Sequence, residues 1–212
     1  MKRSRDPAVQ VPAARRAGSA PVSYAFQTSG QRIFAYPNPP LTDGVVVLRR
    51  WEETDLDCVE QAAEDPDIPK GTTVPATFTP AEGRAWIERQ RSRAESGTGL
   101  SQAIADAASG EAVGAAVLMS RQRGSAEIGY WLVPRARGRG IGSRAVRLLA
   151  GWAVSEAGLA RLEAYVIPDN IASQRVLENA GFRREGLLRS YLSYEGRRFD
   201  ALLYSLLPSD LA

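Results

Sequence analysis

The chain has 212 residues, of which 44% are apolar, and its formal net charge is +3. This length predicts one domain with room for a tail. There is no histidine, and Cys58 is the single cysteine. These facts exclude histidine-based triads, an intrachain disulfide and nearly all zinc sites, so we expect no metal. The apolar runs are too short for a membrane span, and no apolar stretch follows the basic start as in a secretory signal, so we expect a cytoplasmic protein without membrane contact.

The first 40 residues carry the basic excess of the chain. Their net charge is +5, which leaves −2 for residues 41–212. They are rich in Pro, Ala, Ser and Arg and show little apolar periodicity, which indicates a mostly disordered tail (1–40) ahead of one domain (41–212). The tail is either a plain leader or an arm that contacts RNA or the ribosome. The domain itself is not a basic nucleic-acid binder by charge.

The domain is expected to begin with a strand and a helix. Order should start near Gly44, and residues 45–51 are rich in β-formers, which predicts a strand. Thr54 or Asp55 can cap the first helix. Residues 65–78 contain three prolines and are expected to form a loop.

A second helix is predicted to open at Thr79, with Glu82 three residues after the cap. Trp86 on this helix is expected to pack onto the sheet. Three strands are expected next, near 100–106, 112–120 and 125–133.

A long helix is predicted at about 140–157, because its apolar residues fall on one face, and Gly158 is placed to end it. A strand, a short helix and a hairpin are expected after it, at 161–167, 170–180 and 182–207. The hairpin should turn at Glu195 and Gly196.

The junction between the third of these strands and the long helix is the most informative part of the sequence. Gly138, Gly140 and Gly142 stand there at alternate positions. Glycine lets backbone N–H groups approach a ligand closely, and a helix N-terminus adds free N–H donors and the positive end of a dipole. The junction therefore predicts an anion site, to which Arg137 and Arg139 add positive charge.

Two better-known phosphate loops fit this junction poorly. A Walker loop requires Gly-Lys-Ser/Thr, but Gly142 is followed by Ser143 and Arg144. A dinucleotide fingerprint that starts at Gly138 requires glycine or alanine at position 143. Because Glu163 lies roughly where its ribose-binding acid would, the dinucleotide interpretation stays open as a minor alternative.

The loop resembles the acetyl-CoA motif of the GNAT superfamily, Gln/Arg-x-x-Gly-x-Gly/Ala, which here runs from Arg137 to Gly142. Its flanking sequences are also similar to that family, namely the strand Glu127 to Pro134, the Asn170-x-x-Ser173 pair, and Gly181-Phe182. This set of spacings resembles the ribosomal-protein acetyltransferase branch (RimJ/RimL-like). The resemblance covers the chain apart from its tail.

The resemblance implies an acetyl-CoA-dependent N-acetyltransferase with a GNAT-type α/β fold of the α+β kind. That fold is a mixed, mostly antiparallel twisted sheet flanked by helices, and its two central parallel strands splay apart to admit acetyl-CoA. Main-chain groups near Trp131, Leu132 and Val133 are then expected to bind the pantetheine arm, and N–H groups from Gly138 to Ser143 the pyrophosphate. The cofactor-binding residues implied are Trp131, Leu132, Val133, Arg137, Gly138, Arg139, Gly140, Ile141, Gly142, Ser143, Asn170 and Ser173.

Acetyl transfer to an amine requires a base, a stabilised thioester oxygen and a proton for the departing thiolate. Glu127 is the candidate base, because it matches the position of the glutamate base in histone-type members of the superfamily. The alternative is a solvent-facing glutamate or one bound to a backbone amide. Asn170 is expected to cap a helix through the N–H of Ser173, and the resemblance places this pair beside the cofactor thiol, where Ser173 would assist the thiolate. Cys58 is expected to be a small core residue rather than a nucleophile.

Two positions depart from the family's patterns. Leu177 stands where many members have a tyrosine acid, and Leu192 where some ribosomal members have a catalytic glutamate. Tyr191 and Tyr194 are near in sequence, although such residues more often pack within a strand.

The acceptor predicted from the resemblance is a primary amine, which reacts in a ternary complex with acetyl-CoA. It is a protein N-terminal α-amine, as the branch suggests, or a small molecule such as a polyamine, an amino acid or an aminoglycoside. A non-catalytic acyl-CoA-binding module is the competing class, because of the departures at Leu177 and Leu192. Acceptor contacts are expected from loops around 66–80 and 190–198. A monomer and a homodimer both stay open.

Overall fold

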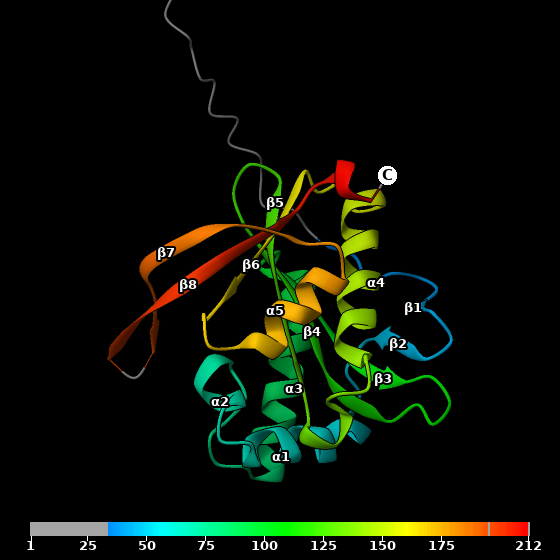
Figure 1. Cartoon of the computed structure of the whole chain (residues 1–212). Coiled ribbons are helices and arrows are strands. Elements are labelled where there is room, and N and C mark those ends of the chain that lie inside the picture. The colour runs from blue at the N-terminus through cyan, green and yellow to red at the C-terminus, as the bar shows by residue number, and fades with distance from the viewer. Residues whose placement is uncertain (1–33, 195, 212) are drawn as a thin grey trace, which may run out of the picture.

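The computed structural model describes residues 34–194 and 196–211 of the chain. In this part an eight-stranded sheet carries helices on both faces (Figure 1). The strands are β1 (Leu41–Thr42), β2 (Val46–Arg49), β3 (Gly99–Asp106), β4 (Ala112–Ser120), β5 (Ser125–Leu132), β6 (Arg161–Val166), β7 (Arg183–Tyr194) and β8 (Arg197–Leu206). The helices are α1 (Leu56–Glu64), α2 (Ile68–Gly71), α3 (Pro80–Glu95), α4 (Ile141–Ser155) and α5 (Ile171–Asn179). The predicted fold class, a mixed and mostly antiparallel sheet flanked by helices, is confirmed.

The strands lie in the order β1-β2-β3-β4-β5-β6-β8-β7, and every neighbouring pair is antiparallel except β5 and β6. These two parallel strands pair only at their beginnings, and the last partners are Glu127 and Glu163. Beyond this point β5 keeps its bonds to β4 and β6 keeps its bonds to β8. The sheet is therefore split into two antiparallel units, as the resemblance implies for the central strands.

The two faces of the sheet are covered by different helices. Trp131 of β5 packs against Trp86 of α3, with ring centroids 6.1 Å apart, and Trp51 packs against both rings. Tyr130, the preceding residue, instead reaches Ser173 of α5. Because successive strand residues point to opposite faces, we name these the α3 face and the α5 face. The predicted packing of Trp86 onto the sheet is confirmed.

Several local predictions are also confirmed. The Oγ1 atom of Thr79 accepts the N–H of Glu82 at 3.2 Å and so caps α3. Gly158 follows α4 with a φ of +64°, which a glycine adopts without strain. Cys58 is 2% exposed in the core, and burial raises the pKa of its thiol to about 12.

Two expectations about the first half of the domain are wrong in part. The segment 65–78 contains the short helix α2, because Pro69 lies in its first turn, where no backbone N–H is required. The folded part also begins earlier than Gly44. Phe34 is 3% exposed, and the hydroxyl of Tyr36 donates to the carbonyl oxygen of Ser101 at 3.1 Å. Of the predicted tail at residues 1–40, residues 1–33 lie outside the described residues.

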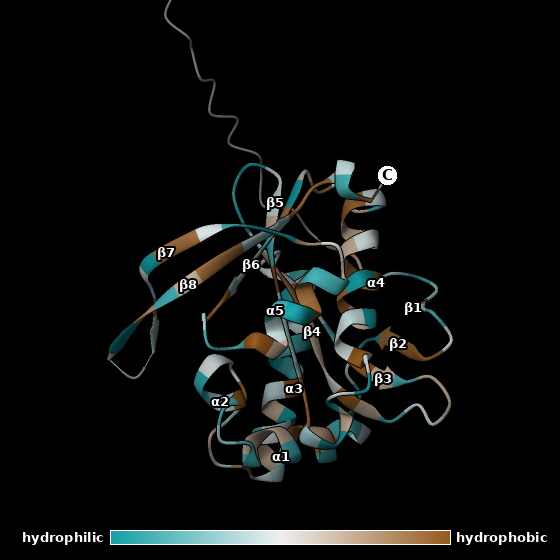
Figure 2. Cartoon of the chain, in the orientation of Figure 1, coloured by the Kyte–Doolittle hydropathy of each residue, from teal (hydrophilic) through white to brown (hydrophobic). Residues whose placement is uncertain are grey.

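The last two strands form the expected long hairpin, which extends past the helices of the α3 face (Figure 1). Its middle is apolar and its outer end is hydrophilic (Figure 2). No helix in the described part of the chain is long and apolar enough to cross a membrane.

Candidate active site

The backbone of β5 is free on one edge after it leaves β6. The N–H of Val133 donates to the carbonyl oxygen of Val113 at 3.0 Å, on the β4 side. Main-chain groups alternate between the two edges of an antiparallel strand. Those of Trp131 therefore also point to β4, and those of Tyr130 and Leu132 point to the free edge. Of the three residues expected to bind pantetheine, only Leu132 offers its main chain there, and Tyr130 joins it.

The loop after β5 forms a row of unsatisfied donors. Gly138 and Gly140 have φ values of +72° and +76°, and Gly140 is the N-cap of α4. Among the described residues, nothing accepts a hydrogen bond from the backbone N–H groups of 138–143, and helical bonding starts with the N–H of Arg144. A Cβ atom at Gly138 or Gly140 would meet nothing within 4 Å, so the space beside these donors is open. This loop can hold an anion.

The third glycine of the loop lies close to its neighbours. A Cβ atom at Gly142 would be in ordinary van der Waals contact, 3.4–3.6 Å from the side chains of Val176, Tyr130 and Leu132. The start of α4 therefore lies directly against β5 and α5. This close packing brings the donor row next to the free edge of β5.

The two arginines of the loop differ in their surroundings. Both residues are exposed, and the side chain of Arg137 is 47% exposed. Arg137 donates to Asp65 Oδ2 at 2.8 Å through Nη2 and to the carbonyl oxygen of Leu132 at 3.0 Å through Nε. Arg139 therefore fits the prediction of a phosphate-binding charge better than Arg137, because the guanidinium of Arg137 already has protein partners.

Glu127 lies on the α3 face at the point where β5 and β6 separate. It is four residues before Trp131 on the same strand, and its strand partner is Glu163. Its carboxylate is 19% exposed and forms an ion pair with Arg121. The partner is thus a side chain, not the backbone amide considered as an alternative.

A second group of polar side chains surrounds Glu163. Arg161 donates to one carboxylate oxygen of Glu163 at 2.7 Å, and the hydroxyl of Tyr165 donates to the other at 2.8 Å. The ring of Tyr191 stacks on Tyr165 with centroids 4.7 Å apart. Burial, the Tyr191 hydroxyl and the Glu163 carboxylate raise the pKa of Tyr165. Tyr191 thus faces the neighbourhood of Glu127, not that of Ser173.

A bulge in β7 gives Tyr191 this direction. The register between β7 and β8 shifts between Leu188 and Leu192, and Ser190 within the bulge has a φ of +54°. The N–H of Ser190 donates to Asp200 Oδ1 at 2.7 Å, which fixes the turn of the strand. Bulges commonly re-aim a side chain beside a functional site.

Tyr130 is a candidate functional residue that the sequence did not single out. Its hydroxyl donates to Ser173 Oγ at 3.0 Å, on the α5 face. Burial raises the pKa of Tyr130, and the bond to Ser173 opposes this only in part. The alternation of side chains along β5 could have drawn attention to Tyr130, because it points this residue away from the face of Glu127. The partner on α5 could not be read from the spacing.

The start of α5 follows the prediction. Asn170 Oδ1 accepts the N–H of Ser173 at 3.0 Å, so Asn170 caps the helix. Leu177, at the family's tyrosine position, is 1% exposed in the core. The hydroxyl next to Ser173 therefore comes from β5 and not from α5.

The arrangement combines an anion loop, a free strand edge, a carboxylate on one face of that strand and a phenol on the other. Such a site can bind a phosphorylated chain along β5 and move protons on both of its sides. Among residues 34–194 and 196–211 there is no group of three His, Cys, Asp or Glu side chains that could hold a metal ion.

Comparison with known proteins agrees with this geometry. Residues 46–183 match the family described as acetyltransferase (GNAT) domain. Uncharacterized N-acetyltransferase p20 of Bacillus licheniformis is 30% identical over 169 residues, which cover 79% of this chain and 95% of that protein. The structure of Mycobacterium smegmatis RimJ in complex with CoA-disulfide is 27% identical, with a TM-score of 0.71 over 84% of this chain and 92% of that one. The fold is shared with the ribosomal-protein-S5-alanine acetyltransferase of Vibrio fischeri, at a TM-score of 0.63 and 22% identity, over 84% and 98% of the two chains.

The chain therefore belongs to the GNAT family and is an N-acetyltransferase, with RimJ/RimL-like ribosomal-protein acetyltransferases among its structural neighbours.

Proposed function

We propose that this enzyme transfers the acetyl group of acetyl-CoA directly to a primary amine in a ternary complex, and that the amine is a protein N-terminal α-amine. The observation that carries the proposal is the meeting of the free β5 edge with the donor row at 138–143. One feature binds an extended amide chain and the other binds phosphates, which are the two halves of coenzyme A. RimJ of Mycobacterium smegmatis, described as a CoA complex, supports the same ligand.

The residues present fit acetyl-CoA. The N–H groups from Gly138 to Ser143 would hold the pyrophosphate, with charge from Arg139. The main-chain groups of Tyr130 and the N–H of Leu132 would bond the pantetheine amides, in place of the groups of Trp131 and Val133, because the carbonyl oxygen of Leu132 already accepts from Arg137. When bound, acetyl-CoA supplies the acetyl group and leaves as a thiol.

The protons move on the two faces of β5. Glu127, on the α3 face, takes a proton from the acceptor ammonium, directly or through a water, so that the amine nitrogen can form its bond to the acetyl carbon. Tyr130, on the α5 face, donates its hydroxyl proton to the sulfur as the carbon–sulfur bond breaks. Ser173 holds the Tyr130 hydroxyl in place, and Asn170 fixes Ser173 through the helix cap.

A polypeptide acceptor is favoured by the surface next to Glu127. On the hairpin side of this region, Tyr191 is 45% exposed while it stacks on Tyr165. The hairpin also extends past the helices (Figure 1). An open surface of this kind leaves room for a chain to continue beyond its first residue. The cytoplasmic location, the homodimer and the contact of the tail with RNA or ribosomes stay predictions.

Free thiol release from acetyl-CoA tests the proposal. The acceptors are a peptide with a free N-terminal alanine, the same peptide with an acetylated N-terminus, spermidine, free alanine and an aminoglycoside. We expect release with the free peptide and none with its blocked form. Release with only the small amines would refute the polypeptide acceptor, and CoA binding without release for any amine would favour the non-catalytic acyl-CoA-binding module.

A further inference from the structure

We propose that Arg137 is a positioning residue that couples the phosphate loop to the start of α2, on the acceptor side, and not a phosphate ligand. The inference rests on the proposed function, because it concerns how bound CoA affects the acceptor side. Three elements meet at this guanidinium, namely the end of β5, the loop before α4 and the turn between α1 and α2.

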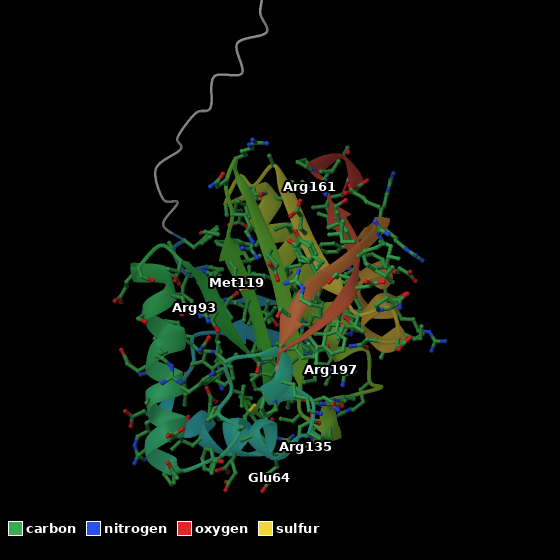
Figure 3. The ribbon with its side chains drawn as sticks, turned by 90° about the vertical axis from the view of Figure 1, so that its left-hand side faces the viewer. Glu64, Arg93, Met119, Arg135, Arg161 and Arg197 are labelled. Atoms are coloured by element: carbon green, nitrogen blue, oxygen red, sulfur yellow. The ribbon has the colours of Figure 1, made fainter. Side chains whose placement is uncertain are left out.

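The guanidinium is held at two of its nitrogens. Its Nη2 atom lies 2.8 Å from Asp65 Oδ2, and its Nε atom lies 3.0 Å from the carbonyl oxygen of Leu132. A planar guanidinium with two partners in different directions is fixed in orientation. Figure 3 shows Glu64, which ends α1, and Arg135, which precedes the loop, at the same end of the molecule.

The partner carboxylate organises α2. While Oδ2 of Asp65 receives Arg137, Oδ1 accepts the N–H groups of Asp67 at 2.9 Å and Ile68 at 3.0 Å. Burial opposes the charge of Asp65, but these N–H groups and Arg137 outweigh it and hold the pKa of the carboxyl below its usual range. The side chain of Asp65 is only 4% exposed. Without Arg137 it would be a buried carboxylate with no cation, which is costly.

The loop has what it needs for a phosphate without this guanidinium. The loop itself contains the free N–H groups at 138–143 and the exposed Arg139. A phosphate that drew Arg137 away would leave Asp65 unpaired. We infer that Arg137 stays paired with Asp65 when an anion binds. Anion binding, by fixing the loop, then also fixes the N-terminus of α2.

This connection has a thermodynamic consequence. A bound CoA that stabilises the loop also stabilises the segment 65–71, which lies among the helices of the α3 face. Coupling between two sites is reciprocal, so acetyl-CoA and the acceptor would each raise the affinity of the other. Arg137 would thus affect acceptor binding more than cofactor binding.

Hydrogen exchange with CoA alone as the probe tests the coupling. In the wild-type protein, CoA should slow exchange at the amides of Asp67 and Ile68 by about fivefold or more. Asp65→Asn keeps an oxygen for both amides and removes the charge, and Arg137→Gln removes the cation. In each variant the slowing should fall below about twofold, while the Kd for CoA stays within about threefold of wild type.

Arg135→Gln is the matched control. Arg135 is two residues from Arg137 and also pairs with an acid, Glu111, whose side chain is 58% exposed, whereas that of Asp65 is buried. Arg135 also donates to Gln61 of α1, but it has no bond to Asp65 within the described residues. This variant should keep the full slowing at Asp67 and Ile68. The double variant Asp65→Asn with Arg137→Gln should be no worse than either single variant, since both remove one connection.

The possible results separate the hypotheses clearly. A CoA Kd raised more than about tenfold in Arg137→Gln but not in Asp65→Asn would make Arg137 a phosphate ligand and overturn the proposal. Undiminished slowing in both variants would overturn it as well. If the wild-type protein bound no CoA, the proposed function would fail together with the coupling, whereas CoA binding without any slowing at Asp67 and Ile68 would refute the coupling alone.

Discussion

At the scale of single residues, the alternation of side chains along β5 places the proposed base and the proposed acid on opposite faces of the sheet. Glu127 and Tyr130 are three residues apart and therefore lie on opposite faces of the strand. One face carries α3 and the other carries α5. A ligand that lies along the free edge of β5 would have the proposed base on one side and the proposed acid on the other.

Replacement of the proposed base tests this division. Glu127→Gln should lower kcat by about 10²–10⁴-fold, because an amide cannot accept the proton, and should leave the KM for acetyl-CoA nearly unchanged. Initial rates of thiol release with the alanine peptide measure both. Glu88→Gln, at an exposed position of α3, is the control with wild-type rates. A wild-type kcat in Glu127→Gln would remove this residue from the mechanism.

The proposed acid has its own test. Tyr130→Phe should lower kcat about tenfold or more, because the ring stays and only the proton donor is lost. Since burial raises the pKa of Tyr130, its hydroxyl stays protonated at neutral and mildly alkaline pH, so kcat should not fall there on its account. Tyr36→Phe removes a hydroxyl that donates to the carbonyl oxygen of Ser101 and should keep kcat. Equal kcat values for wild type and Tyr130→Phe would contradict the role.

The single cysteine allows a pH prediction. With a pKa of about 12, the thiol of Cys58 carries almost no thiolate at pH 8, and the thiolate is the reactive form. A thiol-reactive disulfide reagent should therefore leave the native protein unmodified at pH 8 and modify it once in urea. Rapid modification of the native protein would show an accessible thiol and reopen chemistry through Cys58.

The sequence predicted candidate site residues but not the directions of their side chains. The spacing around Arg137 predicted the anion loop, since glycines and a helix start are local features. It could not show that Arg137 turns to Asp65, which is 72 residues away, or that Tyr130 meets Ser173, which is 43 residues away. It also could not tell which strand edge is free, so the main chains of Trp131 and Val133 were expected at the ligand instead of that of Tyr130.

At the scale of elements, local chemistry explains which predictions held. The α3 helix was found from its cap at Thr79, α4 from its periodicity and Gly158, and α5 from Asn170 and Gly181. The α2 helix was missed because its prolines suggested a loop, and its N-terminal N–H groups depend on Asp65 for acceptors. The connection of β7 and β8 was visible as a hairpin, but the bulge that aims Tyr191 was not.

Alanine substitution of two glycines should change the free energy of unfolding in opposite directions. A Cβ atom at Gly114 of β4 would lie 2.2 Å from the carbonyl oxygen of Trp131, so Gly114→Ala must push β4 and β5 apart. We expect a loss of about 2 kcal/mol or more in the free energy of unfolding. Gly151 of α4 has open space around it, and Gly151→Ala should gain about 0.5–1 kcal/mol. Urea unfolding of both variants checks this, and equal stability would show that the strands can adapt.

At the scale of the whole molecule, the folded domain includes residues ahead of the region that matches the family. Phe34 and Tyr36 pack on the domain, and the guanidinium of Arg50 lies 4.7 Å from the Tyr36 ring centre. These contacts join the segment before β1 to the first strands. Residues 34–40 contain no charged side chain, so the net charge of −2 holds for residues 34–212 as well.

Shortened chains test this boundary. A chain that starts at Phe34 keeps these aromatic contacts, and one that starts at Asn38 loses them. The second should be less stable by about 3 kcal/mol, which is typical for the loss of a buried phenylalanine. Denaturant titration of both chains measures the difference. Identical midpoints would mean that Phe34 contributes nothing to the stability of the domain.

The short parallel pairing of β5 and β6 also bears on how the chain folds. From β1 to β6 the strands lie in the sheet in the order of the sequence, and β3 to β5 form a meander whose contacts are close in sequence. In contrast, β2 pairs with β3 across the segment that carries α1, α2 and α3. The β6–β8–β7 unit is joined to the first unit through the strand pairs that end at Glu127 and Glu163. During synthesis β1 to β5 can be complete before β6 exists, so the parallel junction, which spans α4, can form only after the antiparallel unit that precedes it. The junction that leaves the sheet open for a ligand is then absent from the first unit to fold, and substitutions there should leave the early folding of β3 to β5 unchanged.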